Sequence, residues 1–213
     1  MAAKFWSNVD IDIQTAVGAA QTITAITKAD PGVVTHSGTD PTNGDILLMS
    51  AAGMTEVHTR AFAASAVNGA ANTFELGEDT TDYHTFTSGS FQVVTLGASM
   101  TNVQDVSASG GEPEFADITT VHDQIRRRVP TVVSPFSIQF GCLFEPGDAA
   151  MVELGSASRS LTTRVVKITF ADGAYMVGNA YVSAAGVPTG SAQDVVKTNV
   201  TFEFQGLPTV YEA

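Results

Sequence analysis

The chain has four histidines, His36, His58, His84 and His122, and histidine is the side chain that most often holds a metal ion or titrates near neutral pH. A histidine metal site has a recognisable spacing, such as two histidines four residues apart on a helix with a glutamate beside the first. No pair of these histidines has such a spacing. We therefore interpret all four as polar residues of loops or strand ends, and we expect no metal site.

Three carboxylates lie close together at Glu78, Asp79 and Asp82, which raises the question of a calcium site. Calcium-binding loops place oxygen ligands at regular intervals around a glycine that makes the turn. Here Gly77 precedes the acidic residues instead of lying among them. The spacing therefore favours a solvated acidic loop.

Motifs for covalent and nucleotide chemistry are absent from the sequence, which has no Gly-x-Ser-x-Gly turn, no phosphate-binding loop and no dinucleotide fingerprint. The single cysteine, Cys142, falls on the apolar side of an alternating segment, which predicts a buried thiol and excludes an internal disulfide. We expect no catalytic residue, no cofactor, and folding in a reducing cytoplasm.

The only basic cluster is Arg126, Arg127 and Arg128, in a chain with 10 Lys and Arg, 22 Asp and Glu, and a net charge of −12. This balance argues against nucleic-acid binding, because phosphate contacts need basic surfaces. Two interpretations of the cluster stay open. It is either a solvated loop or a contact between subunits, where the planar guanidinium of arginine pairs well with carboxylates. We state the second as a prediction to be tested.

The elements that would position these residues are mainly strands. The last quarter of the chain, residues 161–208, has the pattern of a three-stranded meander, and Asp172 and Gly173 make a dipeptide typical of a two-residue hairpin turn. Apolar and polar side chains also alternate at residues 136–144 and, over a shorter run, at residues 9–15. Strict alternation indicates strands with one buried face.

One short helix is predicted at residues 149–154, where Asp148 is a good N-cap and Gly155 would end or weaken the helix. No apolar run approaches the length of a transmembrane helix. The acidic and polar residues from Asp10 onward are unlike a signal peptide.

Residues 23–96 differ from the rest of the chain, because short apolar pieces alternate there with clusters of turn-forming residues. This pattern predicts a small all-β domain inserted into a larger β domain made of residues 1–22 and 97–213. Small residues at 17–20 and 97–99 would connect the two as flexible links. The expected fold class is mainly β: a β-sandwich or barrel with one short α-helix, plus the inserted all-β domain.

Residues 108–208 resemble the major tail tube proteins of long-tailed, siphovirus-like bacteriophages. The resemblance rests on GGEPEFADITTVHD, on the strand FSIQFGCLFEPGDAA with the short helix after it, and on TTRVVKITFADGAYMVGNAYV followed by DVVKTNVTFEFQG. In that family this order of elements forms a β-sandwich or barrel. Six copies close into a ring, and rings stack into a tube for the genome. The resemblance covers about half of the chain, plus the strand at residues 9–15.

A second resemblance lies within residues 30–90, in DPGVVTHSG, NGDILLMSAAGMTEVHTRAF and NTFELGEDTTDYHTFTSGS. These segments are similar to a small β module of phage virion proteins that has been likened to the first catalytic cysteine half-domain of ubiquitin-activating enzymes. His58 and Thr59 stand where that module usually has Asn and Gly, which would reshape one hairpin. The segment has no cysteine, so the likeness implies no thioester chemistry.

The tail tube resemblance implies a virion structural protein, not an enzyme, that forms stacked and hexameric rings as a conduit for genome delivery. The implied partners are further copies of the chain, other tail proteins such as the tape measure and the terminator, and viral DNA that passes through the lumen without specific binding. No membrane insertion is expected. The protein would be assembled in the cytoplasm of the host bacterium and would remain in the virion tail.

Two alternatives stay open. One is a tail terminator or distal tail ring protein, and the other is a virion-borne module that binds the host surface through Phe62, Phe74, Tyr83 and Phe86. Six inserted domains would block the lumen if they pointed inward, so we expect them on the outside of the tube. A contractile sheath would clash with them there, which favours a non-contractile tail.

Overall fold

The computed structural model describes residues 6–184 and 186–213. Within them the chain is mainly β with one helix, which confirms the predicted fold class. The elements, in chain order, are β1 (Asp10–Val17), β2 (Gln21–Ile26), β3 (Val33–His36), β4 (Ile46–Ala52), β5 (Ala61–Ala63), β6 (Ser65–Asn68), β7 (Thr73–Glu75), β8 (Ser88–Ser99), β9 (Val103–Ser109), β10 (Pro113–Asp117), β11 (Arg128–Val133), β12 (Ser137–Leu143), α1 (Ala149–Ser160), β13 (Thr163–Thr169), β14 (Tyr175–Ala184), β15 (Lys197–Phe204) and β16 (Thr209–Tyr211).

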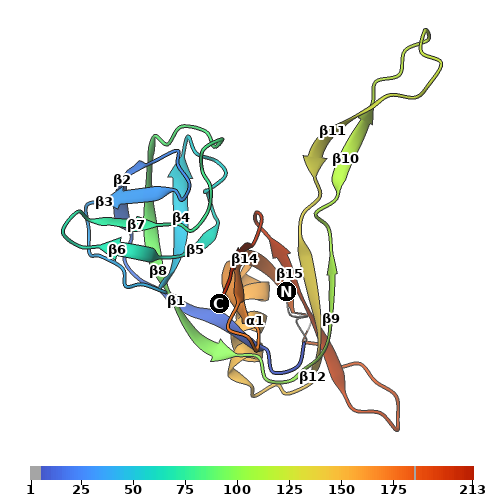
Figure 1. Cartoon of the computed structure of the whole chain (residues 1–213). Helices are drawn as coiled ribbons and strands as arrows, with labels where there is room; N and C mark the ends of the chain where they lie inside the picture. The colour runs from blue at the N-terminus through green and yellow to red at the C-terminus, as the bar shows by residue number, and fades with distance from the viewer. Residues whose placement is uncertain (1–5, 185) are drawn as a thin grey trace.

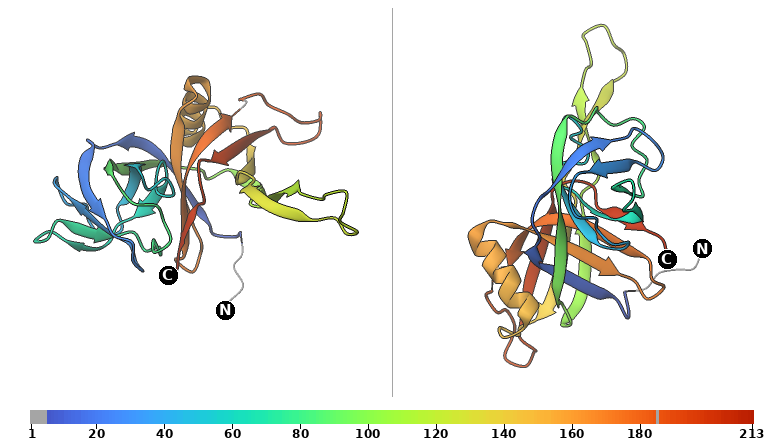
Figure 2. Two further views of the ribbon diagram at one scale, coloured as in Figure 1. Left: turned by 90° about the horizontal axis from the view of Figure 1, so that it is seen from above. Right: turned by 90° about the vertical axis from the view of Figure 1, so that its left-hand side faces the viewer.

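One part of the fold is the strand run β1-β13-β14-β15-β12-β9, on which α1 packs (Figure 1, Figure 2). The alternation predicted for the last strand is present in β15, where Thr198, Val200, Phe202 and Phe204 are buried. Phe202 meets Phe140 of β12 edge to face, with ring centroids 5.5 Å apart. We call the strand run β1-β13-β14-β15-β12-β9 the main sheet, and these side chains belong to its core.

Helix α1 begins as predicted, because the Asp148 side chain accepts a hydrogen bond from the Met151 N–H at 3.0 Å. The expectation that Gly155 ends the helix is wrong, since α1 continues to Ser160. A helical glycine costs only about 1 kcal/mol relative to alanine. Burial of Leu154 and Ala157 against the sheet outweighs that cost.

Strands β2 to β7 and the first half of β8 surround a second core, and we call residues 23–96 the module. Phe62, Phe74 and Phe91 are fully buried there, and the rings of Phe74 and Phe91 lie 5.2 Å apart in an edge arrangement. These aromatic side chains give the module a hydrophobic core of its own.

The module and the main sheet share strand β8. The start of β8 pairs with β4, its end pairs with β1, and the Gly18 N–H donates to the Val93 carbonyl at 2.7 Å. The expectation of flexible links is therefore wrong: Val17 and residues 97–99 lie inside paired strands. The proposed boundary between residues 96 and 97 falls within β8.

A third buried cluster fastens the module to the main sheet. Ile46, Ala63 and Val94 of the module pack against Val165 of β13 and Val177 of β14. Val165 belongs to the face of β13 opposite Val166 and Ile168, so this strand is buried on both faces. The module thus covers a part of the sheet that would otherwise expose apolar side chains.

Candidate assembly interface

Strands β10 and β11 form a separate two-stranded hairpin that projects away from the rest of the molecule (Figure 1). Every residue of both strands is exposed. The hairpin starts where Gly110 and Gly111, with φ angles of 90° and 78°, turn the chain out of β9. The sequence pattern did not show that these two strands leave the sheet together.

The hairpin is held by its own backbone. At its base the Ser134 N–H donates to the Glu112 carbonyl at 2.9 Å, and at its tip the Ile118 N–H donates to the Arg127 carbonyl at 3.0 Å. The Asp123 carboxylate closes the tip by accepting the Thr120 N–H at 2.9 Å. A two-stranded hairpin alone is marginally stable in water. A partner surface would therefore stabilise this one.

Apolar side chains on the hairpin lie open to solvent. They are Phe115, Ile118, Val121, Ile125, Val129, Val132 and Val133, with exposed fractions between 44% and 96%. Single exposed apolar residues are ordinary, whereas a continuous group of them marks an interaction surface. The hairpin has the composition of a surface that another protein covers.

The three arginines predicted to contact another subunit all lie on this hairpin and are exposed. Arg126 and Arg127 belong to the tip, and Arg128 is the first residue of β11, opposite Asp117. Hydrogen bonds from the Thr119 side chain and backbone lower the pKa of Asp117, and Arg128 adds to this effect.

The arginines have few partners of their own. Arg127 lies 3.9 Å from Asp123, a weak contact between exposed groups. Among the described residues, no carboxylate lies within ion-pair distance of Arg126. Contact of the three arginines with a neighbouring subunit stays a prediction.

Two of the four histidines belong to buried or paired positions in the module. His36, at the end of β3, is buried between Phe74 and Phe91, with its Nε2 3.3 Å from Asp40 Oδ1 but without hydrogen-bond geometry. His58 Nδ1 accepts the Ala51 N–H at 3.2 Å. Both side chains have structural roles.

His84 and His122 are exposed, as is His58. The Nδ1 of His84 lies 2.5 Å from Glu56 Oε1, and His122 lies at the hairpin tip. Within residues 6–184 and 186–213 no three His, Cys, Asp or Glu side chains are arranged to hold a metal ion.

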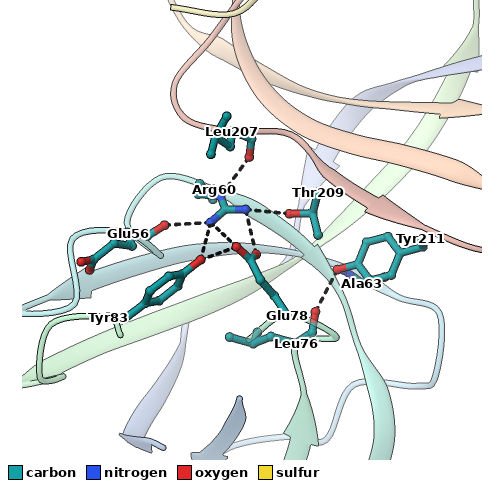
Figure 3. Close-up of polar contacts among 9 residues, drawn as sticks. All are labelled: Glu56, Arg60, Ala63, Leu76, Glu78, Tyr83, Leu207, Thr209 and Tyr211. Atoms are coloured by element: carbon teal, nitrogen blue, oxygen red, sulfur yellow. Dashed lines mark hydrogen bonds and ion pairs between the residues drawn. The ribbon is translucent and has the colours of Figure 1, made fainter. Parts of the chain in front are cut away.

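Arg60 forms a buried polar network that the sequence did not predict (Figure 3). Its guanidinium binds both carboxylate oxygens of Glu78, at 3.0 and 2.8 Å. Nε donates to the Leu207 carbonyl at 3.0 Å, and Nη2 donates to Thr209 Oγ1 at 3.1 Å. Glu78, interpreted as part of a solvated loop, is therefore an internal ion-pair partner.

Two tyrosines complete this connection between the module and the C-terminal segment. The Tyr211 hydroxyl accepts the Ala63 N–H at 2.9 Å and donates to the Leu76 carbonyl at 3.0 Å, and burial raises its pKa (Figure 3). Tyr83 donates to Glu78; burial and this bond raise the pKa of Tyr83. The network fixes the module against β16.

The remaining candidates for chemistry or binding are mostly buried. Burial raises the pKa of the Cys142 thiol to about 11, with smaller contributions from Asp105 and Asp148. Phe62 and Phe74, considered above for binding a host surface, are fully buried in the module core. No helix in the described part of the chain is long and apolar enough to span a membrane.

Comparison with known proteins identified a matching family. Residues 52–213 match the model of a family described as phage tail tube protein (TTP). The match runs from the end of β4 to the last residue, about three quarters of the chain, and it includes the hairpin and the whole run from β12 to β16. A search of curated proteins found no match.

Proposed function

The chain belongs to the phage tail tube protein family, and on that basis we propose that it forms hexameric rings that stack into the conduit through which a phage genome is delivered. Membership makes it a structural component of a virion tail that assembles with other tail proteins. The ring, the stacking and the passage of DNA are the proposed part.

The observation that carries the proposal is the hairpin of residues 113–133. It exposes apolar side chains and arginines, it pairs with no other strand of the described residues, and it projects from the molecule. Burial of one large aliphatic side chain is worth about 1.5–3 kcal/mol. Several such side chains, covered at once, would favour assembly over the free subunit.

An exposed edge of the main sheet gives a second reason for assembly. Its strand order ends at β9, an exposed edge of seven residues. Exposed edges pair readily with other chains, and closure of sheets into a ring removes them. The net charge of −12 suits a conduit, because acidic walls do not hold phosphate.

We further propose that the module lies on the outside of a non-contractile, siphovirus-like tube. The resemblance of residues 30–90 to the ubiquitin-activating enzyme half-domain remains part of this proposal and implies no chemistry. The shared strand β8 and the Arg60 network support a module held at a fixed angle. A gold-labelled tag inserted in the exposed turn at residues 69–72 tests this. Gold along the outer wall is expected, and gold within the lumen would contradict it.

A tail terminator or distal tail ring protein remains the alternative. The test is negative-stain imaging of the purified wild-type protein beside a variant with Arg126, Arg127 and Arg128 replaced by serine. Stacked rings or tubes are expected for the wild type and defective tubes for the variant, with unchanged circular dichroism in both. Single rings that never stack would favour the terminator, and intact tubes from the variant would refute the role of the arginines.

A further inference from the structure

A groove lies beside the end of β9 that is opposite the hairpin. Strand β9 runs from Val103 to Ser109 and leads at Ser109 into the hairpin, so its Val103 end lies farthest from the tip (Figure 1). There residues 6–11 and 99–106 line a hollow of about 420 Å³. Trp6, with 53% of its surface exposed, lies in its wall.

The groove is apolar and acidic. Val9, Val103 and Val106 contribute partly buried apolar side chains. Asp10 and Asp105 are exposed, and no basic residue is among the described residues that line the groove. A side chain that fits this groove would be apolar or positively charged.

The hairpin tip, residues 118–127, has the complementary character. It carries Arg126 and Arg127 against the single acid Asp123, and Ile125 is 79% exposed beside them. In a chain with 10 basic and 22 acidic residues, this is the one basic cluster. Tryptophan and arginine are also the residues most enriched where binding energy concentrates.

We propose that the hairpin tip of one subunit binds in the groove of a second copy of the chain, with Arg126 and Arg127 facing Asp10 and Asp105 and Ile125 packing near Trp6. This inference rests on the proposed tube function and names the surface that receives the hairpin. The contact joins two different surfaces of the molecule. A head-to-tail contact of this kind repeats from copy to copy, as a stack of subunits requires.

A second hollow provides the matched alternative. Residues 133–136 and 203–207 line a hollow of about 500 Å³ at the base of the hairpin. A hairpin that bound there would bring the hairpin ends of two subunits together, and two such contacts related by a twofold axis would stop at a dimer. Exposed Leu207 marks this site.

Cross-linking separates the two arrangements. One variant carries Ile125→Cys with Gln104→Cys in the groove, and the other carries Ile125→Cys with Leu207→Cys at the hairpin base. Both variant proteins are treated with a short bismaleimide. Native Cys142 is buried with a raised pKa and does not compete. A ladder of dimers, trimers and larger species is expected only from the first pair. A ladder or dimers only from the second pair, or no product from either, would overturn the inference.

Charge exchange is the second test. One double variant carries Arg126→Asp and Arg127→Asp, and the other carries Asp10→Arg and Asp105→Arg. Each double variant should fail to form tubes, and the variant with all four changes should form them again.

Fluorescence quenching is the third test. Acrylamide quenching of Trp6, the only tryptophan, should fall at least twofold when wild-type subunits assemble. Wild-type tubes in which Trp6 stays fully quenchable would refute the groove contact and leave the tube function standing. Failure of the wild type to form any ring or tube would overturn both.

Discussion

Replacing Arg60 with leucine should destabilise the protein by about 3 kcal/mol, because it leaves buried acceptors without a donor. Loss of one partner of a buried ion pair costs about 3–5 kcal/mol. The Arg60 side chain is 9% exposed but that of Glu78 is 23% exposed, so water would solvate part of the orphaned carboxylate. We therefore expect a value at the lower end of that range.

Arg60→Leu should also weaken the contact between the module and the C-terminal segment more than it weakens the rest of the fold. Arg60 binds Leu207 and Thr209 of the C-terminal segment, so its loss should speed amide exchange in residues 207–211 and at Ala63. Urea unfolding at concentrations below assembly gives the free energy, and hydrogen exchange gives the location. Glu78→Gln in the Arg60→Leu background should recover part of the loss, with a coupling of about 2 kcal/mol.

Arg164→Leu is the matched control. The side chains of Arg164 and Glu153 are 17% and 26% exposed, similar to those of Arg60 and Glu78, and their ion pair joins β13 to α1. Its loss should lower stability without faster exchange at residues 207–211. A loss below about 1 kcal/mol for Arg60→Leu, or equal exchange in both variants, would refute the argument that Arg60 fastens the module.

The other predictions concern single groups. Tyr211→Phe should cost about 1–3 kcal/mol in urea unfolding, because the Ala63 N–H loses its acceptor; a cost near zero would contradict the bond. Asp148→Ala should cost about 1 kcal/mol by loss of the α1 cap, and Asp148→Asn should restore most of it. The pKa of Cys142 is about 11 in the folded protein and 9.0 for the free group. The stability that the neutral thiol contributes is therefore complete below pH 9 and is lost as the pH rises toward 11. Cys142→Ala should reduce the fall of the unfolding free energy between pH 9 and 11, and an unchanged slope in that range would contradict this prediction.

Local patterns predicted the regular parts of the main sheet. The position of the turn at Asp172 and Gly173 was predicted from the dipeptide, but the predicted two-residue turn is wrong. The Phe170 N–H donates to the Ala174 carbonyl at 2.8 Å, which leaves a three-residue loop, and Gly173, but not Asp172, has a positive φ, of 89°. Strand β15 was readable because one of its faces is buried and the other is not. The end of α1 could not be predicted, because it depends on the packing of Leu154 and Ala157 against the sheet and no local sequence signal indicates that packing.

The connections between distant segments could not be predicted in the same way. Arg60 and Leu207 are 147 residues apart, and only an arginine between Val57 and Phe62 hinted at a buried charge. Charge alone led to the prediction that the three arginines contact another subunit, and it did not show that Arg128 begins a strand. The length of the hairpin and the groove at the far end of β9 depend on how the strands assemble in space.

A reconstruction of the assembled tube by electron cryomicroscopy tests the central claim most directly. The account predicts a ring of six subunits in which residues 113–133 of each hairpin are covered by another subunit and the module lies on the outer surface. Hairpins that stay exposed to solvent in a complete tube would contradict it.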